Sequence, residues 1–299
     1  MAWERFRHHR LVGTTVDVEV LGGDGPGIDA AVAAEMQRLE RVFSAFDPDS
    51  ELSRWKRDEL DVPSPELAHV MAVALDWQLR SGGRFNPLAG VVSARWREAA
   101  EQGEPPGDDE LAALAATIVE PRYRIEDGVP IRTGDCDDLD LNAIAKGAIV
   151  DLALARADGL DVEALVVNAG GDLAHRGATP ITVAVENPLR PYDNEPPLSE
   201  LELSNGAVAT SGGSRRPLVV GGRRYSHVVD PRTGRTVDHI ASITVVAHDA
   251  LTADVAATVL GAVAPTRALD EARGLGVDCL IVEPDGSTFG ALPARRPGP

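Results

Sequence analysis

Two spacings of apolar residues follow one another along the N-terminal part of the chain. Residues 11–21 alternate apolar and polar side chains, which predicts a strand. Residues 29–46 repeat apolar side chains at helical spacing, which predicts a helix that the polar stretch 47–50 ends. Ser64-Pro65 joins an N-cap hydroxyl to a proline in the first turn, so a second amphipathic helix is expected from there to Gly82-Gly83.

The rest of the chain mixes short apolar runs with longer helical patterns. Strands are predicted at 123–125, 129–132, 164–168, 181–186, 198–203, 217–220, 223–229, 242–247 and 278–283. Helices are predicted at about 143–158, 250–263 and 265–273, with a short Ala/Leu helix after residue 109. Because several strands form adjacent hairpins and long helices separate others, the expected fold class is α+β, with mixed, largely antiparallel sheets packed against helices.

A polar, glycine- and proline-rich stretch at 99–109 is expected to form an exposed loop. We therefore expect one unit over residues 1–299 that can divide near this loop into two subdomains, with the active site between them. With 299 residues, 43% of them hydrophobic, the chain is long enough to bury a core in either arrangement.

Net charge, cysteine content and the N-terminal segment indicate which partners and which compartment to expect. The formal net charge of −18, with no basic run interleaved with aromatics, disfavours nucleic acid and anionic membranes as partners. Cys136 and Cys279 are too few for a disulfide framework and are expected to be buried apolar residues. The charged N-terminal segment lacks the apolar run of a signal peptide, and no long apolar segment follows, so we expect a cytoplasmic protein without membrane insertion.

The segment Ser226–Gly234, S-H-V-V-D-P-R-T-G, places candidate chemistry at the exit of a strand. Gly221-Gly222 is a hairpin signal, so His227 is expected near the end of the second strand of that hairpin. Asp230-Pro231 should stop the strand, because proline has no amide hydrogen to donate. An imidazole and a carboxylate held at a turn can act on a ligand. The alternative is that His227 and Asp230 only cap a hairpin.

Three further fragments are candidates for ligand contact. In D-L-N-A-I-A-K-G, Lys146 near the start of a helix can hold a phosphate or a flavin carbonyl, or it is a solvated helix lysine. In V-V-N-A-G-G-D, the glycines after a buried strand allow a ligand to approach the backbone, or they only form the strand exit. The A-T-S-G-G segment, residues 209–213, is read as a loop that can cradle a pyrophosphate.

The fourth fragment, T-A-D-V-A-A-T, places Asp254 and Thr258 four residues apart, on one face of a helix. A carboxylate and a hydroxyl are hard oxygen ligands suited to magnesium beside phosphates. The alternative is that Asp254 interacts with the helix dipole.

Taken in their order along the chain, these fragments and three earlier segments resemble the ApbE family, the FAD:protein FMN transferases. The earlier segments are similar to the family's glycine-threonine strand, its F-S-x-F…S-E-[IL]-S-R segment and its G-x-F-D-P-T-x-G…W segment, and lie at Gly13–Thr15, Phe43–Trp55 and Gly83–Trp96. Single motifs of this kind are weak signals, whereas the ordered series, which spans most of the chain, is specific.

The resemblance implies a magnesium-dependent transfer of FMN from FAD onto a threonine or serine hydroxyl of a target flavoprotein, with release of AMP. It implies that Asp254, Thr258 and a backbone carbonyl near Ala145 bind the metal, and that His227 and Asp230 are catalytic. The implied FAD pocket is lined by Ser44, Phe46, Asn86, Lys146, Asn168, Gly170, Gly171, Asp172, Thr210, Ser211 and Gly212.

The sequence departs from the family pattern in two places. Asn86 and Leu88 stand where the family usually has aspartate and threonine, and Gly213-Ser214-Arg215 replaces an acidic-aromatic continuation. These departures bear on FAD orientation and acceptor choice more than on the metal site. The lipoprotein signal frequent in the family is also absent, in agreement with a cytoplasmic form.

Two other classes of function compete with the transferase. An FAD-binding protein, or a pyrophosphatase that cleaves FAD to FMN and AMP, would use the same pocket. An assembly factor for a redox complex could keep the pocket as a vestige, but the intact His227, Asp254 and Thr258 argue against this reading.

Overall fold

An antiparallel sheet of eight strands forms the centre of the molecule. The computed structural model describes residues 2–192, 194–213 and 217–293. The strand order is β1-β2-β5-β6-β9-β12-β13-β14, and every neighbouring pair is antiparallel. The strands are β1 (Trp3–Leu11), β2 (Thr14–Leu21), β5 (Ala164–Ala169), β6 (Asp172–Gly177), β9 (Gly206–Gly212), β12 (Ser242–Ala247), β13 (Asp278–Val282) and β14 (Thr288–Ala291).

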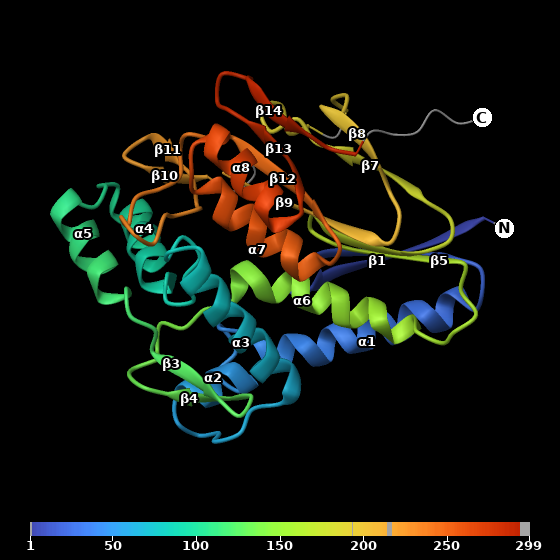
Figure 1. The fold of residues 1–299 in the computed structure, drawn as a ribbon, viewed down its shortest axis with the longest axis horizontal. Coiled ribbons are helices and arrows are strands. Elements are labelled where there is room, and N and C mark those ends of the chain that lie inside the picture. Colours follow the sequence, from blue (N-terminus) through green and yellow to red (C-terminus); the bar gives the residue numbers. More distant parts are fainter. Residues whose placement is uncertain (1, 193, 214–216, 294–299) are drawn as a thin grey trace.

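Helices and a small ribbon cover the two faces of this sheet. Figure 1 shows α6 and α7 against the central strands, with α1 alongside α6 and α8 near β13. These helices are α1 (Gly25–Phe43), α6 (Asn142–Leu154, followed by the 3₁₀ turn Ala155–Ala157), α7 (Ala250–Gly261) and α8 (Pro265–Leu275). On the other face, the ribbon of β7 (Ile181–Val185) and β8 (Ser199–Leu203) packs on Leu173, Val208 and Val246. The inner strands therefore have apolar side chains on both faces.

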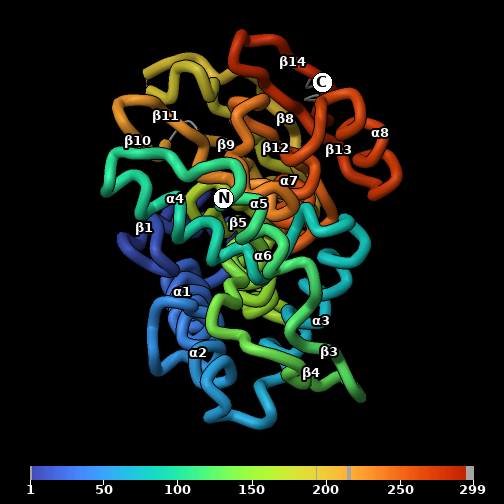
Figure 2. Tube along the Cα trace, turned by 90° about the vertical axis from the view of Figure 1, so that its left-hand side faces the viewer, coloured from blue at the N-terminus to red at the C-terminus, as the bar shows by residue number. Residues whose placement is uncertain are grey.

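The segments between α1 and α6 form a mainly helical part beside the sheet (Figures 1 and 2). It contains α2 (Glu51–Lys56), α3 (Pro65–Arg80), α4 (Gly90–Gln102), α5 (Asp108–Thr117) and the hairpin of β3 (Tyr123–Glu126) and β4 (Val129–Arg132). The short hairpin of β10 (Leu218–Val220) and β11 (Arg223–Tyr225) packs against α4. The core is continuous between the helical part and the sheet.

The sequence predicted most elements and missed several. The predicted strands at 164–168, 242–247 and 278–283, and the helix after Ser64, are confirmed. The prediction of the first strand at 11–21 was wrong at its N-terminal end, because Leu11 belongs to a separate edge strand, β1, and β2 begins at Thr14. The missed elements are β1, α2, α4, β6 and β9, and α4 extends to Gln102, into the stretch 99–109 that was predicted as a loop.

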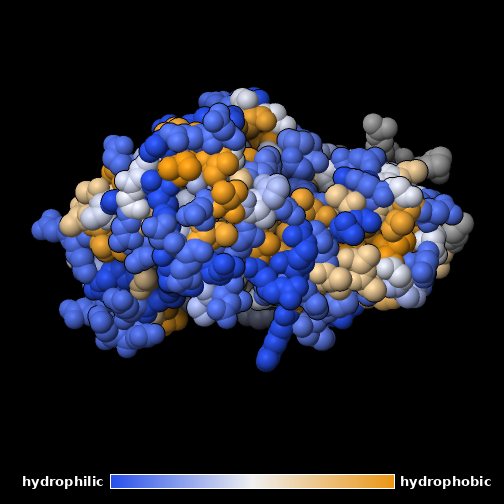
Figure 3. All heavy atoms as spheres, turned by 90° about the horizontal axis from the view of Figure 1, so that it is seen from below, coloured by the Kyte–Doolittle hydropathy of each residue, from blue (hydrophilic) through white to orange (hydrophobic). Residues whose placement is uncertain are grey.

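Two predictions about the general character of the chain can be compared with the structure. Cys136 and Cys279 are both buried, as expected, and neither is in a disulfide. Among the described residues, no helix has the length and apolarity that a membrane span requires. The face of the molecule seen from below is mainly hydrophilic, with separate small hydrophobic patches (Figure 3).

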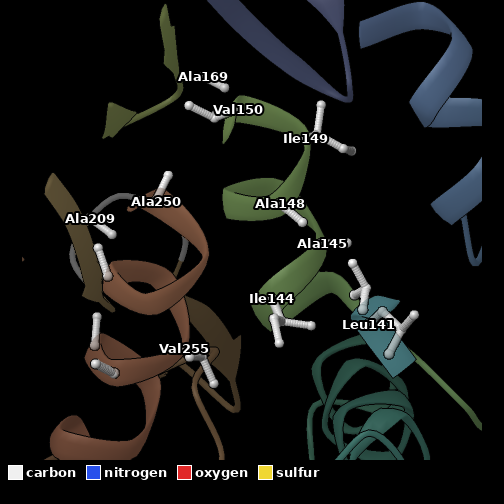
Figure 4. Close-up of a cluster of buried hydrophobic side chains, with 14 of the residues drawn as sticks. Leu141, Ile144, Ala145, Ala148, Ile149, Val150, Ala169, Ala209, Ala250 and Val255 are labelled. Carbon is white, nitrogen blue, oxygen red and sulfur yellow. The ribbon is translucent and has the colours of Figure 1, made fainter. Parts of the chain in front are cut away.

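The packing of α6 against α7 depends on Gly147. A Cβ atom at Gly147 would lie 2.3 Å from the carbonyl oxygen of Ala250, so the two helices approach too closely for any larger residue. Figure 4 shows small buried side chains on both helices, among them Ala148 of α6 and Ala250 of α7. The close approach brings the motifs that contain Lys146 and Asp254 to the same place.

Gly147→Ala is therefore expected to lower the melting temperature by several degrees, because the added methyl group costs about 1–3 kcal/mol of overpacking. Gly274→Ala in α8 is the matched control. It has open space around its Cβ position, so it should leave stability unchanged or raise it by up to about 1 kcal/mol. Thermal unfolding of both variants checks this, and equal stability would mean that α6 and α7 can separate without cost.

Candidate active site

The site begins with an ion pair between α6 and the start of β6. The ammonium of Lys146 contacts the carboxylate of Asp172. Asp172 is buried, with 1% of its surface exposed, whereas one third of the Lys146 side chain is exposed. Asp172 shares the helix-covered face of β6 with Ala174, as expected from strand alternation. Lys146 thus has its carboxylate partner inside the protein and part of its side chain at the surface.

Asp254 on α7 lies close enough to the same lysine to feel its charge. Its carboxylate accepts a hydrogen bond of 3.1 Å from the amide of Gly147. Desolvation raises the pKa of Asp254, while the Lys146 ammonium and the Gly147 amide oppose that rise. The single ammonium of Lys146 therefore lies near two carboxyl groups, those of Asp172 and Asp254.

Thr258 follows Asp254 by one helical turn. Its hydroxyl donates a hydrogen bond of 3.4 Å to the backbone carbonyl of Asp254, so both residues lie on one side of α7. A hydroxyl oxygen that donates one hydrogen bond still has lone pairs to offer a cation. Ala145 lies directly before Lys146 in the interior of α6, with its side chain buried. The predicted magnesium ligands thus come from two adjacent helices.

Asp151 on α6 was not predicted, and it fixes the N-terminus of α7. Its carboxylate accepts hydrogen bonds of 2.8 Å from the amides of both Ala250 and Leu251. Asp249, the N-cap residue, accepts a further one from Thr252. Burial raises the pKa of Asp151 to about 6 despite these donors. A single charged residue in the otherwise apolar end of the helix was the sequence signal for a structural role.

This raised pKa predicts how stability depends on pH. The native protein keeps a proton on Asp151 up to about pH 6, whereas the ordinary value is 3.8. Between these values the native state binds more protons, so this group's contribution to stability falls as pH rises. The Asp151→Asn variant has no titrating group at this position. The free energy of unfolding of wild type, relative to that of Asp151→Asn, should therefore increase by on the order of 1–3 kcal/mol when the pH is lowered from 7 to 4. Urea unfolding at both pH values checks this, and a constant difference would contradict it.

The predicted glycine turn lies between β5 and β6. Gly170 has φ +64° and packs against Thr14 so closely that a Cβ atom would lie 2.4 Å from the threonine hydroxyl. Asn168 closes the turn by accepting a hydrogen bond of 3.0 Å from the amide of Gly171. Strand alternation places Asn168 on the face of β5 opposite to the helices. Its amide group thus has a structural task, and its contact with FAD stays a prediction.

The A-T-S-G-G segment was predicted as a loop, and the structure corrects this. Thr210, Ser211 and Gly212 are the last residues of strand β9. Thr210 lies on the face away from the helices and hydrogen-bonds the hydroxyl of Thr244 at 2.9 Å. Ser211 and Gly212 line a small cavity of about 10 Å³ that also touches Gly261 of α7. The small hydroxyl and glycine residues suggested a loop because they carry little apolar signal.

His227 lies beyond β11, so its predicted position within that strand was wrong. His227 is exposed and lies in a hairpin that follows β11. In this hairpin the amide of Val237 donates a hydrogen bond of 2.8 Å to the carbonyl of Val228. Ser226 and Val228, on either side of His227, line the same small cavity as Ser211 and Gly212. The hairpin therefore adjoins the end of β9.

Asp230 occupies the turn of this hairpin. Its carboxylate forms two hydrogen bonds with the Arg232 guanidinium, of 2.9 and 2.7 Å. The backbone carbonyl of Asp230 accepts hydrogen bonds from the amides of Thr233 and Gly234. These contacts agree with the capping alternative for Asp230, and its catalytic role stays a prediction.

Three other predicted FAD contacts lie in the helical part. Ser44 ends α1, and its hydroxyl accepts hydrogen bonds from the amides of Phe46 and Asp47. Phe46 is 75% exposed, so its ring is accessible for stacking. Asn86 is buried and uses both ends of its amide, accepting from Leu88 and donating to the carbonyl of Ile118 at 2.7 Å.

This last contact gives a physical reason for asparagine at position 86. An aspartate could accept from Leu88 but, when ionised, could not donate to the carbonyl of Ile118. Of the second departure, Ser214 and Arg215 lie outside the described residues.

Comparison with solved structures defines the class of fold. An ApbE protein from Thermotoga maritima superposes with a TM-score of 0.86 at 26% sequence identity, and the match covers 97% of each chain. The flavin transferase ApbE from Vibrio cholerae gives a TM-score of 0.79 at 23% identity, over 97% of both chains. The molecule thus has the ApbE type of α+β fold.

Sequence comparison identifies the family. The ApbE family model matches residues 12–281, and the chain belongs to this family. A protein from Rhodobacter capsulatus named FAD:protein FMN transferase is 29% identical over 96% of the chain, which spans 56% of that relative's length. One of the same name from Escherichia coli K12 is 26% identical, over 88% of this chain and 81% of its own.

Proposed function

We propose that this protein transfers FMN from FAD to a threonine or serine hydroxyl of a target flavoprotein and releases AMP. The observation that carries the proposal is the meeting of Lys146, Asp172 and Asp254 between α6, α7 and β6. The Gly170 turn follows strand β5, beside β6, and the His227 hairpin adjoins the end of β9. The relatives' names supply the reaction, and the cluster supplies groups suited to a pyrophosphate.

The charge of this cluster supports a requirement for magnesium. With Asp254 ionised, as metal binding requires, Lys146 offsets only one of the two carboxylates, Asp172 and Asp254, and both phosphates of FAD are negatively charged. A pyrophosphate would therefore meet a site of its own sign without a further cation. Asp254 and Thr258 present the hard oxygens that magnesium prefers, so the residues fit this ion. When bound, the ion would stabilise negative charge as AMP leaves.

In this proposal each of the residues around the cluster has its own task. The partly exposed Lys146 binds a phosphate oxygen, and Asp172 holds the ammonium in position. Gly170 and Gly171 allow the flavin nucleotide to approach the backbone. His227 accepts the proton of the acceptor hydroxyl as its oxygen bonds to the FMN phosphorus, while the bond from that phosphorus to the AMP oxygen breaks.

Mass analysis tests this proposal. The purified chain is incubated with FAD, magnesium and candidate flavoprotein subunits from the same genome, and AMP and free FMN are quantified. The expected result is an acceptor that gains the mass of FMN, less water, on one threonine or serine, with one AMP released per modified acceptor. AMP together with free FMN and an unmodified acceptor would identify a pyrophosphatase instead. Bound, uncleaved FAD would identify a binding protein.

Lys146→Ala is expected to weaken FAD binding by roughly 10- to 100-fold, the usual worth of a hydrogen bond to a charged group. The change also leaves the buried Asp172 without its ammonium, which should lower stability. Lys146→Ala combined with Asp172→Asn removes that unpaired charge. Titration calorimetry should find weak FAD binding in both variants, and recovered affinity in the double variant would mean that Lys146 acts only as the partner of Asp172.

A further inference from the structure

The hairpin that carries His227 is held from two sides. Backbone hydrogen bonds join Val237 to Val228 and Asp230 to Arg235, each 2.8 Å long. On one side, His239 bonds to the carbonyl of Val263, just past the C-terminus of α7, at 2.9 Å. The hairpin is thereby tied to the helix that carries Asp254 and Thr258. On its other side the hairpin meets α4.

One side chain of α4, Trp96, contacts both ends of the segment that contains His227. Its indole nitrogen donates a hydrogen bond of 2.8 Å to the carbonyl of Gly234, at the turn. Its ring lies 5.0 Å from the ring of Tyr225, two residues before His227, with an interplanar angle of 44°. Trp96 is buried, with 4% of its surface exposed. A single rigid side chain thus contacts both ends of the ten-residue segment from Tyr225 to Gly234.

We propose that Trp96 is a positioning residue for flavin transfer, which sets the backbone around His227 by holding the chain on both sides of it, at Tyr225 and at Gly234. The inference rests on the proposed function, because it gives His227 a reaction to serve. Placement of a catalytic group within a fraction of an ångström affects rate more than substrate affinity. A core role alone would need the apolar ring of Trp96 but not its hydrogen bond to Gly234.

The test separates the hydrogen bond from the packing. Trp96→Phe keeps an aromatic ring in the core and removes the indole donor. Trp77→Phe is the matched control, because Trp77 is also a buried helical tryptophan, on α3, and its ring contact is with Arg80 on the same helix. Each variant is compared with wild type by kcat and KM for FAD, and by hydrogen exchange of residues 227–235.

For Trp96→Phe we expect kcat to fall about tenfold with KM for FAD within twofold of wild type, and the amides at 227–235 to exchange faster. For Trp77→Phe we expect wild-type values of both. A wild-type kcat with unchanged exchange in Trp96→Phe would overturn the positioning role, as would equal effects in the two variants. If the wild-type protein does not transfer flavin, the proposed function fails. The exchange experiment then decides whether Trp96 holds this backbone, which faster exchange only in Trp96→Phe supports and unchanged exchange overturns.

Discussion

Asp254→Asn is expected to reduce magnesium-dependent flavin transfer by orders of magnitude while FAD still binds. Asparagine keeps an oxygen for the Gly147 amide, so the contact between α6 and α7 is retained. It removes the negative charge that anchors the cation. Loss of metal stabilisation at the leaving AMP costs several kcal/mol, and each ~1.4 kcal/mol of barrier is a factor of ten in rate.

Transfer rates over a magnesium titration measure this effect, and FAD affinity is measured in parallel. Asp254→Ala should lose transfer equally. Asp270→Asn is the control, because Asp270 is an exposed aspartate on α8 that pairs with Arg273. A wild-type rate with the same magnesium requirement in Asp254→Asn would place the metal elsewhere.

His227→Ala should lower kcat by about 10²–10⁴-fold, the usual contribution of a general base, without abolishing the magnesium requirement. His227 is exposed, so its removal should change the melting temperature little. Raising magnesium above the concentration that saturates wild type should leave this lowered kcat unchanged, because the defect lies in proton transfer and not in metal binding. Single-turnover transfer measures the chemical step directly.

His69→Ala provides the comparison, since His69 is an exposed histidine on α3. It should transfer FMN at the wild-type rate. If His227→Ala keeps the wild-type single-turnover rate, the hairpin contributes binding surface and the proton goes to another group.

The sequence predicted elements best where the apolar pattern and the capping chemistry agree. The helix after Ser64 has both, and it begins where the N-cap hydroxyl meets its first-turn amide. Edge strand β1 was missed because its exposed face carries charges. Arg5 and Arg7 pair with Glu19 and Asp17 on β2 across the hairpin. Charges that protect a sheet edge hide the alternation that identifies a strand.

The residue types of the site could be predicted, whereas its partners could not. Lys146 and Asp254 are recognisable by motif, but the contact of Lys146 with Asp172 depends on the pairing of distant elements. The close approach at Gly147 is of the same kind, because a glycine inside a helix does not reveal what packs against it. Thr210 shows the converse, since its motif is present but strand alternation turns its side chain to the far face.

The central claim is that FAD and the metal ion bind together at one site, beside Lys146 and Asp254. Its most direct test is a crystal structure of the protein with FAD and manganese, which substitutes for magnesium and scatters anomalously. We predict an anomalous peak bound by the Asp254 carboxylate and the Thr258 hydroxyl, with the FAD pyrophosphate beside it and in contact with the Lys146 ammonium. A manganese peak away from α7, or a pyrophosphate bound without contact to Lys146, would contradict the account.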